Sequence, residues 1–366
     1  MYIWQYKDFP HFVWDTEKVM QRLSEVKKEQ GRLSGMMSIL GFDVKKSTAL
    51  DSMTTDVIMS SAIEGITLNR DDVRSSVAWQ LGIDKAGVPS SNRYVEGAVE
   101  VMCDALGNYQ KPLTKEKLFA WHTMLFPIVK KYEKNTVGNY RQSTTPIQVV
   151  SGRLGSEKVH YEAPESSQVP ELMDELLYFV EHSTIDGILK AAVAHLWFVT
   201  IHPFSDGNGR IGRTIMDMLL ARADGSQNRF YSMSSAIAEN RKSYYNTLEN
   251  TQKNGLDITE WLLWFIDCLG KAVQKSIQTV NRTVEKTAFW DRYRNFALNS
   301  RQIKIINMLF DGFDGKLQTS KWAKINKCSS DTALRDIQDL VQKGIFAQTD
   351  SGGRSTCYEL NFNNNQ

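Results

Sequence analysis

The sequence predicts a mainly α-helical protein that carries one β-hairpin and a small C-terminal domain. Apolar residues recur at spacings of three and four over most of the 366 residues, which is the pattern of amphipathic helices. The segment 148–161 instead alternates across a Gly-bearing turn, which indicates a hairpin. Residues 301–366 change again, to three short helical patterns followed by two short strand patterns.

The N-terminal part, residues 1–100, is expected to be a helical region. Apolar spacing predicts helices over 16–40 and 47–66. The glycines, the proline and the paired serines of 81–92 predict a loop.

The central part, residues 101–285, is expected to be a helical core interrupted by the hairpin, whose strands are predicted at 148–155 and 158–161. The segment 188–200 is apolar on nearly every side, so we expect it to be the central helix. The other helices around and within this part are predicted over 95–106, 113–125, 170–182, 210–222, 241–251 and 258–269, with a long polar helix to about residue 299.

The C-terminal part, residues 300–366, resembles a winged helix-turn-helix domain. The helices are expected over 303–309, 321–325 and 331–343, and the strands over 345–349 and 356–360. In a DNA complex, Thr332 and Arg335 would lie on the recognition helix and Arg354 on the wing.

The charges of this part do not favour DNA strongly. Residues 301–366 hold nine Lys and Arg against seven Asp and Glu, and the recognition helix carries Asp331, Asp336 and Asp339. DNA contact, protein contact and self-association as a homodimer therefore all stay open.

Bulk composition excludes several protein classes. The net charge is +2, from 44 Lys and Arg against 42 Asp and Glu, so no global field attracts nucleic acid or membrane. Four scattered cysteines without a paired spacing fit reduced thiols. No leader and no apolar run of membrane-spanning length is apparent. We expect a cytoplasmic protein without a membrane partner.

Twelve residues, 202–213, concentrate the groups that phosphate chemistry needs. Gly207 and Gly209 allow close backbone approach, and the helix that follows presents free N–H groups and a positive dipole end. Arg210 and Arg213 are three residues apart, so both can reach one polyphosphate.

Two further side chains complete this interpretation. Asp206 supplies a hard oxygen ligand that suits Mg²⁺ bound to substrate phosphates. His202 has an imidazole that can accept a proton from an attacking hydroxyl. We therefore expect ATP with magnesium as the ligand.

This segment resembles the Fic family signature H-x-F-x-[D/E]-G-N-G-R-x-x-R and matches it at every defined position. The resemblance implies that His202 is the general base, that Asp206 holds Mg²⁺, and that the protein transfers AMP from ATP to a Ser, Thr or Tyr hydroxyl of a target protein. The residues implied to bind ATP and its phosphates within the segment are Ser205, Gly207, Asn208, Gly209, Arg210 and Arg213.

The resemblance also implies roles for the hairpin and for a later helix. The hairpin falls where Fic proteins carry a flap that docks the target, here Val150, Ser151, Gly152 and Arg153. The residues implied to line the adenine side are Tyr244, Tyr245 and Gln252.

A Fic inhibitory pattern, [S/T]-x-x-x-E-[G/N], occurs at Ser60 to Gly65. It implies that Glu64 pairs with Arg213 and denies that arginine to the γ-phosphate. The segment from Ser235 to Asn240 is a second literal match, with Glu239 as its acid. Position favours Glu64, because members of the subgroup with an N-terminal inhibitory segment carry it on a helix ahead of the core.

Two other functions remain open at this point. The same site could remove AMP from a modified protein, with Glu64 positioning water. Alternatively, the chain could be a DNA-binding regulator whose core senses nucleotide.

Overall fold

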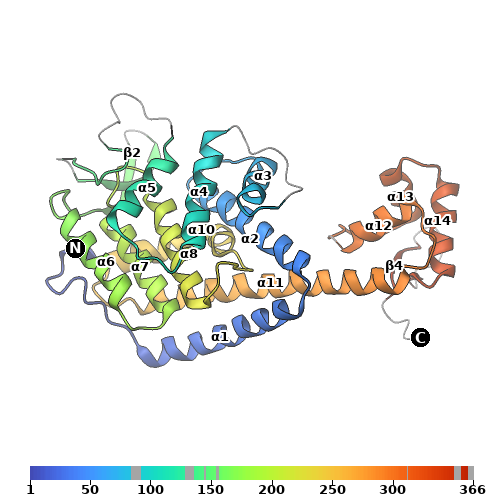
Figure 1. Ribbon diagram of the computed structural model, residues 1–366, viewed down its shortest axis with the longest axis horizontal. Helices are drawn as coiled ribbons and strands as arrows, with labels where there is room; N and C mark the ends of the chain where they lie inside the picture. The colour runs from blue at the N-terminus through green and yellow to red at the C-terminus, as the bar shows by residue number, and fades with distance from the viewer. Residues whose placement is uncertain are drawn as a thin grey trace. The chain divides into compact units, whose positions relative to one another are not determined.

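The computed structural model describes residues 1–83, 92–127, 136–143, 146–153, 156–310, 312–349 and 356–361. It is mainly helical, as expected (Figure 1). The chain divides into two compact units, Met1–Ile277 and Gln278–Gln366, which are described separately. Within the described residues, no helix has the length and apolar character required to cross a bilayer.

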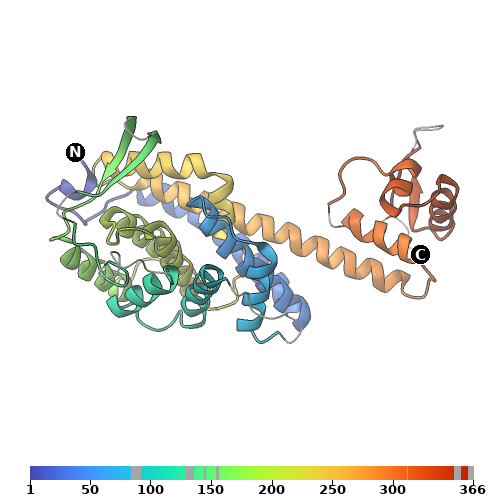
Figure 2. The ribbon, with the colours of Figure 1, turned by 90° about the horizontal axis from the view of Figure 1, so that it is seen from above.

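The first unit begins with one short 3₁₀ helix and three α-helices. They are the 3₁₀ helix η1 (Ile3–Gln5), α1 (Thr16–Ile39), α2 (Phe42–Ile63) and α3 (Arg70–Gln80). Within this unit, α1 lies along α11 (Figures 1 and 2), where Arg22 Nε donates to Asp267 Oδ1 at 2.5 Å. Helix α3 was not predicted.

The predicted bounds of the second helix were wrong at both ends. Helix α2 begins at Phe42 rather than at residue 47, and it ends at Ile63 rather than at residue 66. Glu64 is the C-cap residue, and Gly65 follows with φ +79°. A glycine adopts this left-handed conformation without a Cβ clash, so the helix ends there.

Next come α4 (Arg93–Gly107), α5 (Lys115–Leu125), the hairpin strands β1 (Gln148–Arg153) and β2 (Ser156–Glu162), and α6 (Val169–His182). The strands are antiparallel, with Val149 opposite Tyr161 and Val150 opposite Val159, and the register shifts between these two pairs. The hairpin stands at an edge of the unit (Figure 2). Most of the predicted 81–92 loop, residues 84–91, lies outside the described residues.

The centre of the unit is the pair α7 (Gly187–Ile201) and α8 (Asn208–Asp224). Every residue of α7 from Ile188 to Ile201 is buried except Lys190, which agrees with its apolar character on nearly all sides. The segment 202–207 connects the two helices, so the Fic-like residues are held between the two most buried elements of the fold.

Three helices complete the unit: α9 (Met233–Glu239), α10 (Arg241–Lys253) and the start of α11 (Thr259–Tyr293). The short α9 was not predicted. The sequence analysis split α11 near residue 269, whereas the structure has one helix of 35 residues. The apolar stripe continues past that point through Val273, Ile277 and Val280, all buried, and the single Gly270 does not interrupt it.

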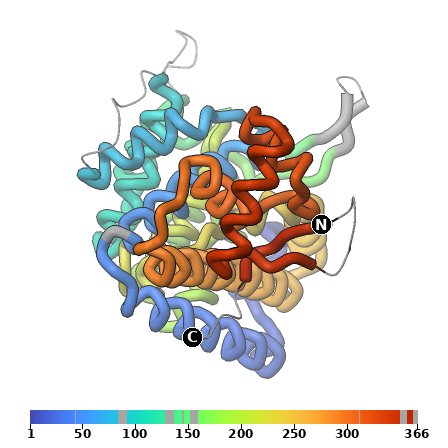
Figure 3. The backbone as a smooth tube through the Cα atoms, turned by 90° about the vertical axis from the view of Figure 1, so that its right-hand side faces the viewer, coloured from blue at the N-terminus to red at the C-terminus, as the bar shows by residue number. Residues whose placement is uncertain are grey.

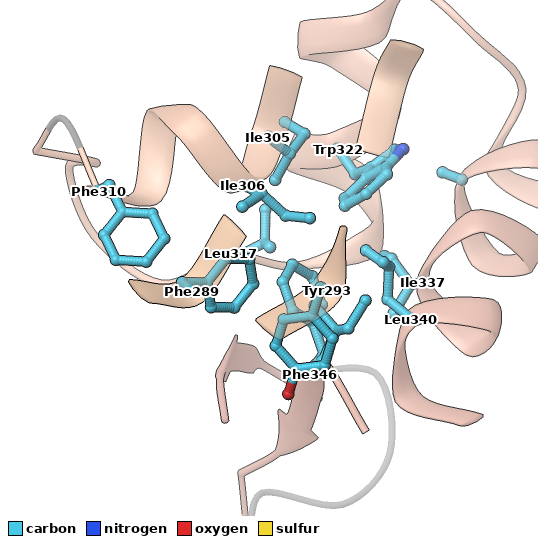
Figure 4. Close-up of a cluster of buried hydrophobic side chains, with 12 residues drawn as sticks. Phe289, Tyr293, Ile305, Ile306, Phe310, Leu317, Trp322, Ile337, Leu340 and Phe346 are labelled. Atoms are coloured by element: carbon cyan, nitrogen blue, oxygen red, sulfur yellow. The ribbon is translucent and has the colours of Figure 1, made fainter. Parts of the chain in front are cut away.

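The second unit contains α12 (Ser300–Phe310), α13 (Thr319–Asn326), α14 (Ser330–Gln342), and the antiparallel strands β3 (Phe346–Gln348) and β4 (Tyr358–Leu360) (Figure 3). These elements follow the expected order. Its core gathers around Trp322 and Phe346, with Phe289 and Tyr293 contributed by the end of α11 (Figure 4). The winged-helix assignment stays a prediction, and Arg354 lies outside the described residues.

The acidic residues of α14 have different environments. Asp336 is buried, and its carboxylate accepts from Arg301 Nε at 2.6 Å and from Arg301 Nη2 at 2.9 Å. Asp339 accepts from Lys343 Nζ at 2.6 Å. Two of the three carboxylates that weigh against DNA contact are therefore paired within the unit, whereas Asp331 is exposed.

Candidate active site

A cleft of about 730 Å³ in the first unit collects the residues that the sequence singled out. Its walls come from the end of α2, the hairpin, the segment after α7, and α10. The predicted site residues that line it are Glu64, Val150, His202, Gly209, Tyr244, Tyr245 and Gln252. Among these, Glu64 and Gln252 are 188 positions apart in the sequence, and both line the same cavity.

His202 is the C-cap residue of α7 and has a left-handed backbone, with φ 53° and ψ 57°. A non-glycine residue in this region costs about 1–3 kcal/mol, so surrounding contacts must hold it there. Arg141 supplies those contacts: its Nε donates to the carbonyl oxygen of His202 at 2.8 Å, and its Nη2 donates to that of Ile201 at 3.3 Å. Arg141 was not predicted as a site residue, because it lies 61 residues before His202.

The environment of His202 keeps the imidazole neutral. The pKa of His202 is lowered to about 4: burial is the largest cause, the Arg141 charge also lowers it, and the Val199 carbonyl and the carboxylates of Glu64 and Asp206 act in the opposite direction. Nδ1 lies 3.4 Å from the Val199 carbonyl oxygen, which assigns the proton to that nitrogen. At neutral pH, Nε2 therefore carries a lone pair that can accept a proton.

The Asn208 side chain shapes the segment between the helices. Its Oδ1 accepts from Phe204 N–H at 2.9 Å, and its Nδ2 donates to the Phe204 carbonyl oxygen at 2.8 Å. Both groups are buried, so the asparagine closes the segment into a tight turn. Gly207 is the N-cap residue of α8, with φ +77°. The Asn208 side chain is thus a structural brace, so only its backbone could contribute to a ligand site at the N-terminal end of α8.

Asp206 lies exposed beside this turn. Its Oδ1 accepts the Gly207 N–H at 2.6 Å. The Asp206 carbonyl oxygen lies 3.2 Å from Nε2 of His122, whose ring stacks on Phe204 at 4.2 Å between centroids. His122 is a second supporting residue that the sequence analysis did not identify, because no local pattern connects it to this segment.

Two arginines on the first turns of α8 retain unused hydrogen-bond donors. Arg210 is stacked 4.9 Å from the Phe126 ring, and its Nε is buried. Arg213 is fully buried. Neither Arg210 Nε nor Arg213 Nη1 has a hydrogen-bond partner among the described residues. Buried cationic donors without partners are costly, and an anion at this helix end would satisfy them.

Arg213 is held by the end of α2. Its Nε donates to Ser60 Oγ at 3.0 Å, and its Nη2 donates to the Ser60 carbonyl oxygen at 2.8 Å and to Glu64 Oε1 at 2.8 Å. The structure thus contains the ion pair between Glu64 and Arg213 that the resemblance implied. Because the resemblance implies an inhibitory role for them, we call Ser60 and Glu64 the inhibitory pair.

The Glu64 carboxylate also fills the space beside the first turn of α8. A Cβ placed on Gly209 would lie 2.0 Å from Glu64 Oε1. A carboxylate therefore occupies the position where the glycine leaves room for an anion. Glu239, the acid of the second literal match, instead pairs with Lys275 and does not line the cleft.

The three residues expected on the adenine side differ in accessibility. Tyr244 is buried, and its hydroxyl lies 2.8 Å from His195 Nε2. Gln252 is also buried and donates through Nε2 to Thr200 Oγ1 at 3.1 Å. Tyr245 is 37% exposed. Of these three, the Tyr245 ring is the most accessible surface for a base.

The hairpin forms another wall of the cleft. Val150 is 48% exposed there. Ser151, Gly152 and Arg153 continue β1 opposite Lys158, Glu157 and Ser156, and their side chains lie outside the described residues. One contact that was not predicted connects the hairpin to α10: His160 Nδ1 lies 2.6 Å from Glu249 Oε2.

The described residues contain no group of three or more His, Cys, Asp and Glu side chains that could enclose a metal ion. Mg²⁺ does not need one, because it commonly binds through one or two carboxylates together with substrate phosphates and water. The exposed Asp206 carboxylate beside the α8 N-terminus fits this kind of site.

Comparison with known proteins gives two family matches within the chain and several similar structures. Residues 112–220 match the Fic/DOC family, and residues 2–83 match a domain of unknown function, DUF4172. A crystal structure of a Fic family protein from Desulfovibrio desulfuricans G20 is similar over 94% of this chain and 96% of that chain, with a TM-score of 0.56 at 19% identity. This likeness shows a shared fold.

Two curated relatives resemble the chain in sequence. A probable protein adenylyltransferase of Aquifex aeolicus (strain VF5) is 25% identical over 225 residues, which are 61% of this chain and 62% of that protein. A protein adenylyltransferase Fic of Aedes aegypti is 26% identical over 215 residues, which are 57% of this chain and 38% of that protein. The chain thus spans less than two thirds of the length of either relative.

Proposed function

We propose that the Fic/DOC domain of residues 112–220 makes this chain a protein adenylyltransferase, which transfers AMP from ATP to a Ser, Thr or Tyr hydroxyl and is held inactive by Glu64. Two curated relatives carry the name protein adenylyltransferase. The observation that carries the proposal is the cleft that joins a neutral histidine to a helix N-terminus with two arginines. The four free cysteines fit a reducing cytoplasm.

The proposed reaction follows from the positions of these groups. Nε2 of His202 takes the proton of the target hydroxyl, the hydroxyl oxygen forms a bond to the α-phosphorus, and the bond to pyrophosphate breaks. Arg210 and Arg213 neutralise the leaving phosphates. Asp206 would hold Mg²⁺, which supplies further charge neutralisation when bound. The edge of β1 near Val150 would dock the target segment by strand pairing.

The inhibitory pair gives this mechanism an off state. Arg213 Nη2 donates to Glu64, so one arginine donor is already occupied by a carboxylate. The same carboxylate lies against Gly209. Productive ATP binding therefore requires Glu64 to move, and resting activity should be low.

The test is incubation with α-labelled ATP and Mg²⁺, with label counted on the enzyme and on lysate proteins. Glu64→Gly should gain covalent label, and Glu64→Gly combined with His202→Ala should lose it. Glu239→Gly is the matched control, because Glu239 belongs to the same sequence pattern but lies outside the cleft. If every variant binds ATP and none transfers label, the proposal is wrong, and removal of AMP from modified proteins becomes the better hypothesis.

A further inference from the structure

The inhibitory helix α2 carries a third polar residue on the same face as the inhibitory pair. Asp56, Ser60 and Glu64 are spaced by four residues, which places them in one row along the helix. Asp217 and Arg213, also spaced by four, form a row on α8. Ser60 and Glu64 meet Arg213, and Asp56 lies near Asp217, which acts on its charge.

Asp56 is enclosed by a polar cluster. Its Oδ1 accepts from Ser232 Oγ at 2.6 Å and from the Ser234 N–H at 3.2 Å. Arg229 Nη1 donates to Asp217 Oδ1. Asp56 is 2% exposed, Asp217 is fully buried and Arg229 is 4% exposed. The cluster therefore connects α2, α8 and the segment that leads into α9.

This cluster holds two carboxylates but one guanidinium. Asp217 Oδ2, Arg229 Nε and Arg229 Nη2 have no hydrogen-bond partner among the described residues. A buried net negative charge is costly, so the cluster favours one bound proton. Burial, followed by the Asp217 charge, raises the pKa of Asp56 to about 7, while Arg229 and the two hydrogen bonds act in the opposite direction.

The remaining charges near the cluster are few. The charge of Arg213, on the same helix, acts to lower the pKa of Asp217, and Asp224 and Tyr231 interact electrostatically with Arg229. Helices α3 and α4, which also pack against α2, contribute the apolar side chains Val73, Val77, Val95 and Val99. Helix α3 also carries Arg74, whose Nη1 pairs with the Asp51 carboxylate on α2.

We propose that Asp56 is a positioning residue for Glu64, which anchors α2 on the core and thereby keeps the Glu64 carboxylate beside Gly209. This inference rests on the proposed inhibitory role of Glu64. We call Asp56 and its hydrogen bonds to Ser232 and Ser234 the anchor. The anchor lies two turns before Glu64, beside α9, and it is separate from the cleft that ATP would enter. Loss of the anchor frees α2 without changing any group that meets substrate.

The anchor has a definite pH dependence. A carboxyl group with a raised folded-state pKa stabilises the anchored state at low pH, and it loses this contribution as the pH rises through that value. If detachment of α2 returned Asp56 to its ordinary pKa of 3.8, detachment would be favoured up to about tenfold more at pH 8 than at pH 6. Inhibition should therefore weaken as the pH rises.

The experiment measures the inhibition ratio, which is the AMP-transfer rate of the Glu64→Gly form divided by that of the form with Glu64, at pH 6, 7 and 8. The ratio removes the pH dependence of the chemistry itself. In the otherwise wild-type chain it should fall up to about tenfold from pH 6 to pH 8. Asp56→Asn keeps the acceptor for Ser232 and Ser234 but cannot ionise, so its ratio should stay flat.

Asp56→Ala removes the acceptor as well, so its ratio should be about tenfold lower than in the wild-type background at pH 6. Asp51→Asn is the matched control, because Asp51 is exposed on the same helix and pairs with Arg74 instead. It should leave the ratio and its pH dependence unchanged. A general loss of stability would change the inhibition ratio of Asp56→Asn and of Asp56→Ala in the same direction. It would also lower the AMP-transfer rate of the Glu64→Gly form.

A second measurement needs no substrate. Amide hydrogen exchange over residues 57–64, corrected for the intrinsic effect of pH, should be faster in Asp56→Ala, whereas exchange in α5 should not change. If Glu64→Gly transfers no AMP at any pH, the proposed function fails, and this exchange result alone decides the anchor. Wild-type pH dependence in Asp56→Asn, or unchanged exchange in Asp56→Ala, would overturn the inference.

Discussion

Glu64→Gln separates the negative charge of Glu64 from the shape of its side chain. Glutamine keeps the size of the side chain and can still accept from Arg213 Nη2, which lies 2.8 Å from Oε1 in the native pair. What it removes is the charge assistance of that bond and the negative charge beside Gly209. The substitution should therefore favour ATP without opening a cavity.

The size of the effect follows from the burial of the two partners. A hydrogen bond to a charged group contributes about 1.5–3 kcal/mol. Arg213 is 1% exposed, but the Glu64 side chain is 33% exposed and partly screened by water, so we take the lower end. About 1.5 kcal/mol corresponds to an affinity for ATP that is about tenfold higher in Glu64→Gln.

Calorimetric titration with a non-hydrolysable ATP analogue and Mg²⁺ measures this change directly. Glu239→Gln is the control, since Glu239 pairs with Lys275 away from the cleft. It should bind the analogue as the wild type does. If Glu64→Gln changed the dissociation constant less than twofold, or if Glu239→Gln changed it equally, the competition between Glu64 and phosphate would be refuted.

Two further predictions concern the chemistry and the frame of the site. Because burial lowers the pKa of His202 to about 4, its imidazole is neutral above that value, and transfer by the Glu64→Gly form should be independent of pH from 6 to 9. An inflection near the ordinary histidine pKa in initial rates would show that the base is not in this environment. Asn208→Ala should lower the free energy of unfolding by about 2–4 kcal/mol in urea titrations, because the buried N–H and C=O of Phe204 lose their partners. The exposed Asn246→Ala should change it by less than about 0.5 kcal/mol, and equal losses for the two variants would contradict the bracing role of Asn208.

The sequence predicted the elements whose signals are local. The apolar spacing of α7 and the dense segment 202–213 are both contained in short stretches, and both identified the centre of the fold. Helices α3 and α9 were missed because they are short and their faces are defined by packing against α2. The split of α11 near residue 269 had a different origin: the sequence becomes more polar beyond that point, and this change was interpreted as the start of a separate helix.

The supporting contacts of the site could not be predicted, because their partners are distant in the chain. Arg141 reaches the backbone of His202 from 61 residues away, and Ser232 reaches Asp56 from 176 residues away. Neither pair has a sequence spacing that a helix or strand period, or a short motif, would predict. The pair of Glu64 and Arg213 is equally distant, at 149 residues, and it was anticipated only through the family resemblance.

A small tilt of α2 about Asp56 would move the Glu64 carboxylate, because both residues belong to the row of polar residues along this helix. Eight residues separate Asp56 from Glu64, a length of about 12 Å at 1.5 Å per residue. A tilt of about 10° around the Asp56 end would displace the Glu64 carboxylate by about 2 Å, which is enough to break a hydrogen bond. Phe42, at the opposite end of α2, is 70% exposed, so a force applied at that end would reach Glu64 through the helix without any molecule entering the cleft.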